Sequence, residues 1–135
     1  MRQERQRPHQ HESTGSRSRR FRRFNEFWPF YVRAHQVPWN RRLHFIGTGV
    51  GFICLFTAAI TENFWFVPVG VVIGYGFAWA GHFFIERNKP ATFKYMAYSL
   101  IADFKMFYLI LNGKMNAEVQ RLQLQANAGK ETTRK

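Results

Sequence analysis

The chain has 135 residues, a length that allows one domain. Twenty Lys and Arg residues against eight Asp and Glu give a net charge of +12, and a single cysteine, Cys54, excludes disulfides within the chain. No Lys or Arg occurs from Leu43 to Glu86, so the basic residues lie on either side of an apolar centre, which favours a membrane protein over a uniformly basic soluble domain.

Residues 1–20 are rich in Arg, Gln, Ser and His and carry no large apolar residue after Met1. Such a segment cannot bury a core, so we expect a disordered basic tail. Next to a membrane, basic residues meet anionic lipid headgroups, and we expect no nucleic-acid partner. Phe24, Phe27, Trp28 and Tyr31 follow at helical spacing, which predicts an amphipathic interfacial helix over residues 21–34.

Two apolar runs then predict a transmembrane hairpin. Pro38 and Asn40 indicate a turn, with Asn40 as the N-cap of a first span that begins near Arg41 and runs over about 43–60. The second span covers about 64–86, and Thr61-Glu62-Asn63 forms the turn between them. Each run approaches the roughly 20 residues that cross a bilayer. The alternative is a buried helical pair in a soluble bundle.

The distribution of charge predicts the orientation of this hairpin. Eleven Arg precede Leu43 and nine Lys or Arg follow Glu86, whereas the turn carries only Glu62. The positive-inside rule therefore places both termini in the cytoplasm, with the protein in a bacterial inner membrane or, if eukaryotic, in the endoplasmic reticulum.

Beyond the hairpin, Arg87 to Pro90 ends the second span. An apolar stripe that includes Phe93, Leu100 and Phe104 predicts a helix over about 91–111 lying at the cytoplasmic interface. Residues 116–135 read as a surface helix with a frayed basic tail. The predicted fold class is an all-α membrane protein, with a single membrane domain over residues 21–115.

Folding the hairpin about Glu62 brings two histidines to one depth. His44 lies 18 residues before this centre and His82 lies 20 after it, so their depths differ by roughly 3 Å. The same mirror pairs Gly51 with Ile73 or Gly74. Each span carries a G-x-x-x-G motif, Gly47 with Gly51 and Gly70 with Gly74, which predicts close packing of the two helices.

Two further residues converge on the same end of the hairpin. Glu86 follows His82 by four residues, on the same helical face, and His35 lies in the turn before the first span. Imidazole and carboxylate groups suit iron, zinc or manganese. We therefore predict a metal site formed by His35, His44, His82 and Glu86 at the cytoplasmic rim of the hairpin.

These residues carry a family resemblance. The segments Tyr31-x3-His35-x4-Asn40-Arg41-x2-His44-x2-Gly47-Thr48, Gly81-His82-x3-Glu86-x2-Lys89-Pro90-Ala91-Thr92 and Ser99-Leu100-x2-Asp103-x2-Met106 resemble the small membrane family typified by the fungal 2-hydroxy fatty acid dioxygenase of phytosphingosine degradation. Some members carry a further histidine where this chain has Tyr95-Met96-Ala97.

The resemblance implies an Fe(II)-dependent reaction with O2 that removes one carbon from a 2-hydroxy fatty acid without 2-oxoglutarate. It implies that His35, His44 and His82 are iron ligands, with Glu86 as a fourth ligand or an orienting partner of His82. Asn40 and Asp103 are then expected to fix ligand orientation, and Lys89 to meet the substrate carboxylate.

Two other functions remain open from the residues alone. One is a membrane module without catalysis that binds anionic lipid or a partner complex through its basic tails. The other is a b-type haem held between His44 and His82, as helical hairpins can do. A homo-oligomer is also left open.

Overall fold

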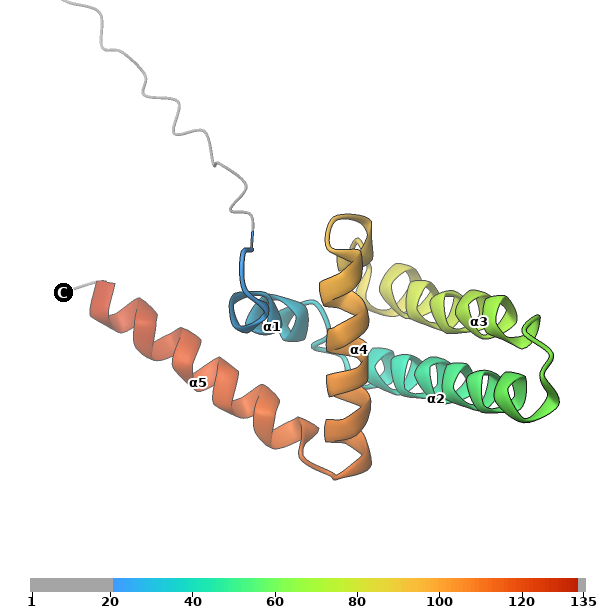
Figure 1. The fold of residues 1–135 in the computed structure, drawn as a ribbon. Helices are drawn as coiled ribbons and strands as arrows, with labels where there is room; N and C mark the ends of the chain where they lie inside the picture. The colour runs from blue at the N-terminus through green and yellow to red at the C-terminus, as the bar shows by residue number, and fades with distance from the viewer. Residues whose placement is uncertain (1–20, 134–135) are drawn as a thin grey trace, which may run out of the picture.

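The computed structural model describes residues 21–133, and within this range the chain is helical without any strand. Figure 1 shows two long helices, α2 (Pro38–Thr61) and α3 (Phe66–Ala80), lying side by side as an antiparallel hairpin. The predicted disordered tail, residues 1–20, lies outside the described residues. The described chain thus has the predicted all-α class with a helical hairpin.

The hairpin exposes its apolar side chains. α2 and the continuous helical segment Phe66–Glu86 are each long and apolar enough to cross a membrane, yet only 22% of the apolar window of each is buried. Ile53, Phe56 and Val72 are among the large apolar residues at its surface. A core helix of a soluble protein buries its apolar faces, so this exposure disfavours the soluble-bundle alternative.

The prediction that Asn40 caps the first span is wrong, because α2 begins at Pro38, three residues before the predicted start at Arg41. Val37 is the N-cap residue, in an extended conformation, and Pro38 occupies the first helical turn. Proline suits this position, since its fixed φ is helical and its missing N–H would have no partner there. Asn40 therefore lies inside the helix, fully buried.

Glycines allow the two hairpin helices to pack closely. A Cβ added at Gly47 would lie 3.0 Å from the backbone oxygen of Gly74, and one at Gly70 would lie 2.7 Å from the Cβ of Cys54. Gly51 faces Gly70 rather than Ile73 or Gly74, so the predicted register is wrong by about one turn. The predicted register takes Glu62 as the centre of the hairpin, whereas the observed glycine pairs have their centre between Ile60 and Thr61.

The second hairpin helix ends in a π-helical turn. α3 continues as η1 (Gly81–Glu86), which has π-helical hydrogen bonding, and Arg87 ends it in the left-handed conformation with φ of 55°. Single π turns widen a helix by one residue per turn and recur at functional sites. This turn lies in the segment that carries His82.

Three further helices pack at the end of the hairpin opposite its turn. α1 (Phe24–Arg33) and α5 (Met115–Thr133) lie on the same side of α4 (Met96–Leu111), which follows a short 3₁₀ turn, η2 (Ala91–Phe93). Figure 1 shows α4 running across the hairpin rather than along it, with α1 on its far side. The predicted helix over 91–111 is thus interrupted, and α5 remains helical to Thr133, through most of the tail that was predicted to fray.

The buried apolar core lies among α1, α4 and α5 rather than inside the hairpin. The apolar residues that it buries are Phe27, Trp28, Tyr31, Val32, Ala91, Ala102, Met106, Met115 and Val119. Trp28 Nε1 also donates to Glu118 Oε1 at 2.8 Å, joining α1 to α5. This core holds the segment before α2 against α4, and the candidate site lies where that core meets the hairpin.

Candidate metal centre

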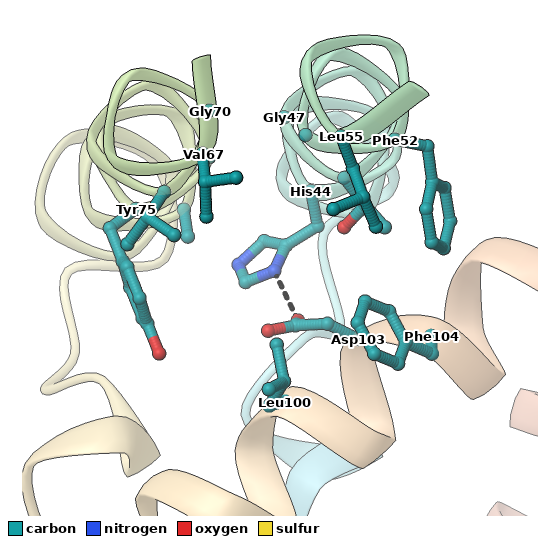
Figure 2. A pocket seen from close by; sticks show the side chains of 15 residues that line it. His44, Gly47, Phe52, Leu55, Val67, Gly70, Tyr75, Leu100, Asp103 and Phe104 are labelled. Atoms are coloured by element: carbon teal, nitrogen blue, oxygen red, sulfur yellow. Dashed lines mark hydrogen bonds and ion pairs between the residues drawn. The ribbon is translucent and has the colours of Figure 1, made fainter. Parts of the chain in front are cut away.

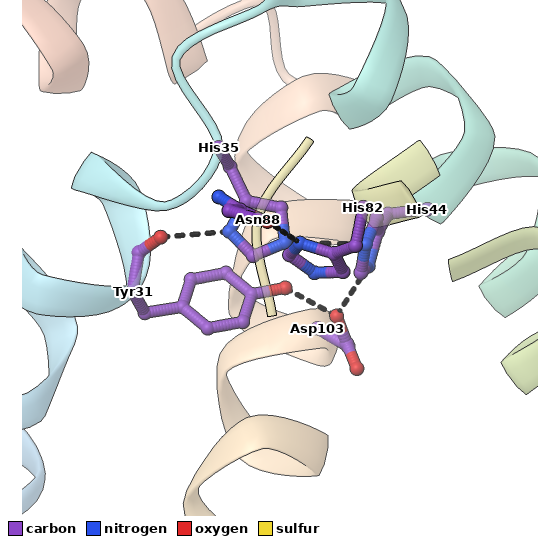
Figure 3. Close-up of polar contacts among 6 residues, drawn as sticks. All are labelled: Tyr31, His35, His44, His82, Asn88 and Asp103. Carbon is purple, nitrogen blue, oxygen red and sulfur yellow. Dashed lines mark hydrogen bonds and ion pairs between the residues drawn. The ribbon is translucent and has the colours of Figure 1, made fainter. Parts of the chain in front are cut away.

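Three histidines from separate segments meet at this junction. His35 follows α1, His44 lies in the second turn of α2 and His82 lies in the π-helical turn η1. All three are buried, and one ligand atom of each lies within 4.8 Å of the others. The predicted convergence of the three histidines is therefore present in the structure (Figure 3).

Side-chain direction explains why His44 and His82 meet despite the shifted register of the backbone. Helical side chains tilt toward the N-terminus of their own helix. In α2 this tilt carries His44 toward the open end of the hairpin, while in the antiparallel partner it carries His82 back toward the turn. The two imidazoles lean toward each other, and their ring centroids are 5.2 Å apart.

Each histidine holds its Nδ1 against a fixed oxygen. His44 Nδ1 donates to Asp103 Oδ1 at 2.8 Å, and the Tyr31 hydroxyl donates to the same carboxylate oxygen. His35 Nδ1 donates to the backbone oxygen of Tyr31 at 2.7 Å. A carbonyl and a carboxylate can only accept, so the Nδ1 atoms of both rings carry the proton.

The third ring is oriented by an amide. His82 Nδ1 lies 2.7 Å from Asn88 Oδ1, and Asn88 Nδ2 donates to the backbone oxygen of Ala34 at 3.0 Å. The second bond determines which end of the amide faces His82, so His82 also donates from Nδ1. Metal-binding histidines in proteins have such partners on the nitrogen that does not bind the metal.

The three protonated Nδ1 atoms leave three Nε2 lone pairs facing one another. His35 Nε2 and His44 Nε2 are 3.1 Å apart, and with both as acceptors neither can donate to the other. Two nitrogens bound to one metal at about 2.1 Å lie roughly 3.0–3.4 Å apart, for octahedral to tetrahedral angles. The separation of His35 Nε2 and His44 Nε2 falls in this range, and one ligand atom of His82 lies within 4.8 Å of both, so the three imidazoles could hold a metal ion.

Burial favours the uncharged forms of His35 and Tyr31. Desolvation, followed by the neighbouring His44 and His82, holds the pKa of His35 well below its ordinary value. Desolvation and the Asp103 charge raise the pKa of Tyr31 well above its ordinary value, so its hydroxyl remains a donor. A neutral His35 presents a lone pair, which is the form that binds metals.

The other predicted site residues lie around this group rather than in it. Glu86 Oε1 accepts from the backbone N–H of Val37 at 2.7 Å, at the start of α2. The π turn changes the number of residues per turn after His82, and Glu86 is not among the side chains whose ligand atoms meet in the histidine group. Asp103 accepts a hydrogen bond from His44, while Lys89 is exposed in the loop after η1.

Asn40 has an unusual environment. It is fully buried, and neither its Nδ2 nor its Oδ1 has a hydrogen-bond partner among the described residues. A Cβ at Gly81 would lie 1.9 Å from Asn40 Oδ1, so the amide fills the space that a side chain at Gly81 would need. Asn40 thus packs between the helices beside the residue that precedes His82.

A groove of about 250 Å³ leads away from the histidines along the hairpin (Figure 2). Its floor is formed by the glycines of both helices, and α4 contributes Leu100, Asp103 and Phe104 to one wall. His44 lies at one end and Leu55 with Val67 at the other. At 1.5 Å per residue, the eleven residues from His44 to Leu55 extend about 16 Å.

Sequence reasoning missed the roles of Tyr31 and Asn88. Tyr31 was assigned only to an apolar stripe. Its place four residues before His35, on the same face of a helix, was a signal that the two side chains lie close together. Asn88 appeared only as part of the segment that ends the second span. Its contact with His82 depends on the left-handed Arg87, for which the sequence gives no clear indication.

A family model described as "2-hydroxy-palmitic acid dioxygenase Mpo1-like" matches residues 21–115. The match begins just before α1 and ends at the start of α5, so it includes every residue of the histidine group. No curated protein and no solved structure matches the chain.

Proposed function

Since the chain belongs to the 2-hydroxy-palmitic acid dioxygenase Mpo1-like family, we propose that it is an Fe(II)-dependent membrane dioxygenase that shortens 2-hydroxy fatty acids by one carbon. The observation that carries this proposal is the set of three buried Nε2 lone pairs, each fixed by a hydrogen bond on the opposite ring nitrogen.

His35, His44 and His82 would hold the iron through Nε2, which leaves coordination positions for ligands other than protein. When bound, iron(II) supplies a centre that accepts a 2-hydroxy acid as a chelate and activates O2. Asp103, Tyr31 and Asn88 hold the imidazoles in the binding tautomer. The surrounding core of α1 and α4 excludes bulk water from their outer side.

The groove along the hairpin suits an acyl tail. Its walls are mostly apolar, and its length of about 16 Å accommodates roughly a dozen carbons at about 1.3 Å per carbon in an extended chain. The polar groups His44 and Asp103 lie at one end only. A fatty acid would therefore place its head group beside the histidines and its tail toward the hairpin turn. Lys89 keeps its proposed role as a contact for the carboxylate of an arriving substrate.

The haem alternative is disfavoured by the third imidazole. A porphyrin held between His44 and His82 needs an open plane between the two rings. The ring of His35 has its centroid 4.5 Å from that of each of the other two. It occupies the volume that a porphyrin would need.

The test is iron content and O2-dependent shortening of a 2-hydroxy fatty acid by anaerobically purified protein. We expect His44→Ala and His82→Ala to lose bound iron and to lower turnover by at least about a hundredfold. Removing a residue that only orients a metal-binding histidine can already cost up to about a hundredfold. Gln123→Ala, at an exposed position on α5, is the matched control and should retain both.

Retained turnover in the two histidine variants would overturn the proposal. The non-catalytic membrane module predicts the opposite pattern. In that case deletion of residues 1–20 abolishes function, and His44 and His82 are dispensable.

A further inference from the structure

The helix that crosses the hairpin, α4, has two different faces. One face is covered by α1 and buries Ser99, Ala102 and Met106. The other face is uncovered, although it is strongly apolar. It exposes between 44% and 67% of the surface of Met96, Leu100, Ile101, Phe104, Tyr108 and Leu111. An uncovered apolar face of this length is not typical of a helix at an aqueous surface.

The uncovered face of α4 is continuous with the exposed surface of the hairpin. The Phe104 ring stacks on Phe52 of α2 at 5.3 Å, and the Phe107 ring stacks on Phe45 at 4.6 Å. Figure 1 shows α4 running across the hairpin with α1 on the side away from it, so the face of α4 opposite α1 is on the hairpin side. Whatever surrounds the apolar hairpin therefore also contacts this face.

Aromatic residues at the two ends of the hairpin indicate where a bilayer would lie. Trp39 is 62% exposed at the start of α2, with the Arg42 guanidinium 4.4 Å from its ring, and Trp65 is 78% exposed at the turn. The 22 residues from Trp39 to Thr61 extend about 33 Å, close to the ~30 Å hydrocarbon thickness. Tryptophans mark the interfaces of membrane proteins.

The depth of α4 follows from its contact with α2. Asp103 meets His44, which lies five residues, or about 7.5 Å, further along α2 than Trp39. Helices that lie flat in the interface bury their apolar face about 5–10 Å into the headgroup and acyl boundary. On the side of α4 that faces α1, Lys105 directs its Nζ to the Trp28 ring, 4.2 Å away.

From these positions we propose that α4 is an in-plane membrane helix, embedded by its uncovered face in the acyl chains of the leaflet near Trp39. α4 packs against α2 and barely touches α3. The groove therefore opens between α3 and α4 into the same leaflet, beside Tyr75 and Leu100 (Figure 2). This proposal concerns contact with lipid, and it does not rest on the proposed reaction.

The test measures the depth of single labels in lipid vesicles. Cys54→Ala removes the native thiol, and an environment-sensitive fluorophore is attached at Ile101→Cys on α4, Val72→Cys on the exposed side of α3, or Gln120→Cys on α5. Vesicles of phosphatidylcholine and phosphatidylglycerol carry a quencher either near the headgroup or near the end of the acyl chain. Iodide serves as the quencher in water.

We expect the label at position 101 to be quenched at least about twofold more by the shallow lipid quencher than by the deep one, as for an interfacial helix. The label at position 72 should show the reverse order, and the label at position 120 should respond to iodide alone. Leu111→Cys should behave as Ile101→Cys does.

Two outcomes would overturn the proposal. Quenching of position 101 by iodide to the extent seen at position 120 would place α4 in water. Protection of position 101 from all three quenchers would show that a second copy of the chain or another protein covers this face. Because the measurement needs neither iron nor substrate, its result is separate from that of the turnover assay.

Discussion

At the scale of single residues, the histidines depend on neighbours that do not themselves bind a metal. Asn88 is the clearest case, because its amide joins His82 to the backbone oxygen of Ala34 across two segments. It fixes both the ring tautomer and the position of the chain that leads to His35. Asp103 has the same role for His44, with Tyr31 holding its carboxylate.

We therefore expect Asn88→Ala to weaken iron(II) binding by about 10- to 100-fold, the usual effect of losing such a partner. Titration of the protein with iron(II) under anaerobic conditions, in competition with a chromophoric chelator, measures the change. Asn88→Asp retains an acceptor oxygen and should recover most of the affinity. Asn25→Ala, at an exposed position on α1, is the control. Wild-type affinity in a folded Asn88→Ala protein would show that Asn88 does not position His82.

At the scale of helices, the contact between Gly81 and Asn40 determines how closely α2 and η1 approach. A methyl group at Gly81 overlaps the Asn40 amide, which lies in the closely packed interface between the two helices. No similar contact exists at Gly76, where an added Cβ meets nothing within 4 Å.

Gly81→Ala should lower the free energy of unfolding by roughly 1–3 kcal/mol, the usual effect of overpacking. Gly76→Ala should stabilise the helix slightly, since glycine costs helices about 0.5–1 kcal/mol relative to alanine. Thermal unfolding in detergent compares the two. The double variant Asn40→Ala with Gly81→Ala should recover stability relative to Gly81→Ala, and failure to do so would place the strain elsewhere.

The docking of α5 on α1 predicts a pH dependence. Bonds from Arg121 and Trp28 lower the pKa of Glu118 from 4.5 to about 2, so the ionised carboxylate is favoured in the folded state. Its contribution to stability is complete above pH 4.5 and is lost as the pH falls toward 2. Glu118→Gln should lower the melting temperature at pH 6 but not near pH 2. An equal difference at both pH values would contradict this assignment.

The sequence predicts the helical hairpin and the histidine group well, because both depend on length, charge and spacing. Two runs of apolar residues joined by a short turn have one simple way to fold. The predicted register of the two helices was wrong, but His44 and His82 still meet because each side chain tilts toward the N-terminus of its own helix. The π turn at Gly81–Glu86 could not be predicted, since the apolar periodicity of the second span gives no signal for it. The contacts of Glu86 with Val37 and of Asn88 with His82 involve the end of this turn and the residues just after it, and they too had no signal in the sequence.

At the scale of the whole molecule, the histidines and the core of α1, α4 and α5 lie at one end of the hairpin, and Glu62 and Asn63 lie at the other (Figure 1). Within residues 21–133, every Lys and Arg lies outside the stretch from Leu43 to Glu86, toward the first end. From the positive-inside rule we propose that the histidine group faces the cytoplasm and that the turn faces the opposite side of the membrane.

Labelling of a cysteine at the turn tests this orientation. In a Cys54→Ala background, Asn63→Cys should react with a membrane-impermeant maleimide added to intact cells or spheroplasts. Gln120→Cys should react only after the membrane is permeabilised. The reverse pattern would invert the topology, and reaction of both before permeabilisation would argue against a spanning hairpin.

The opening of the groove between α3 and α4 has a consequence for how the protein would bind its substrate. A groove that opens sideways into a leaflet samples molecules dissolved in that leaflet, so occupancy follows their mole fraction among the lipids rather than their concentration in water. Adding inert phospholipid at constant total substrate would then slow the reaction by surface dilution. A product shorter by one carbon would leave by the same opening and remain in the bilayer.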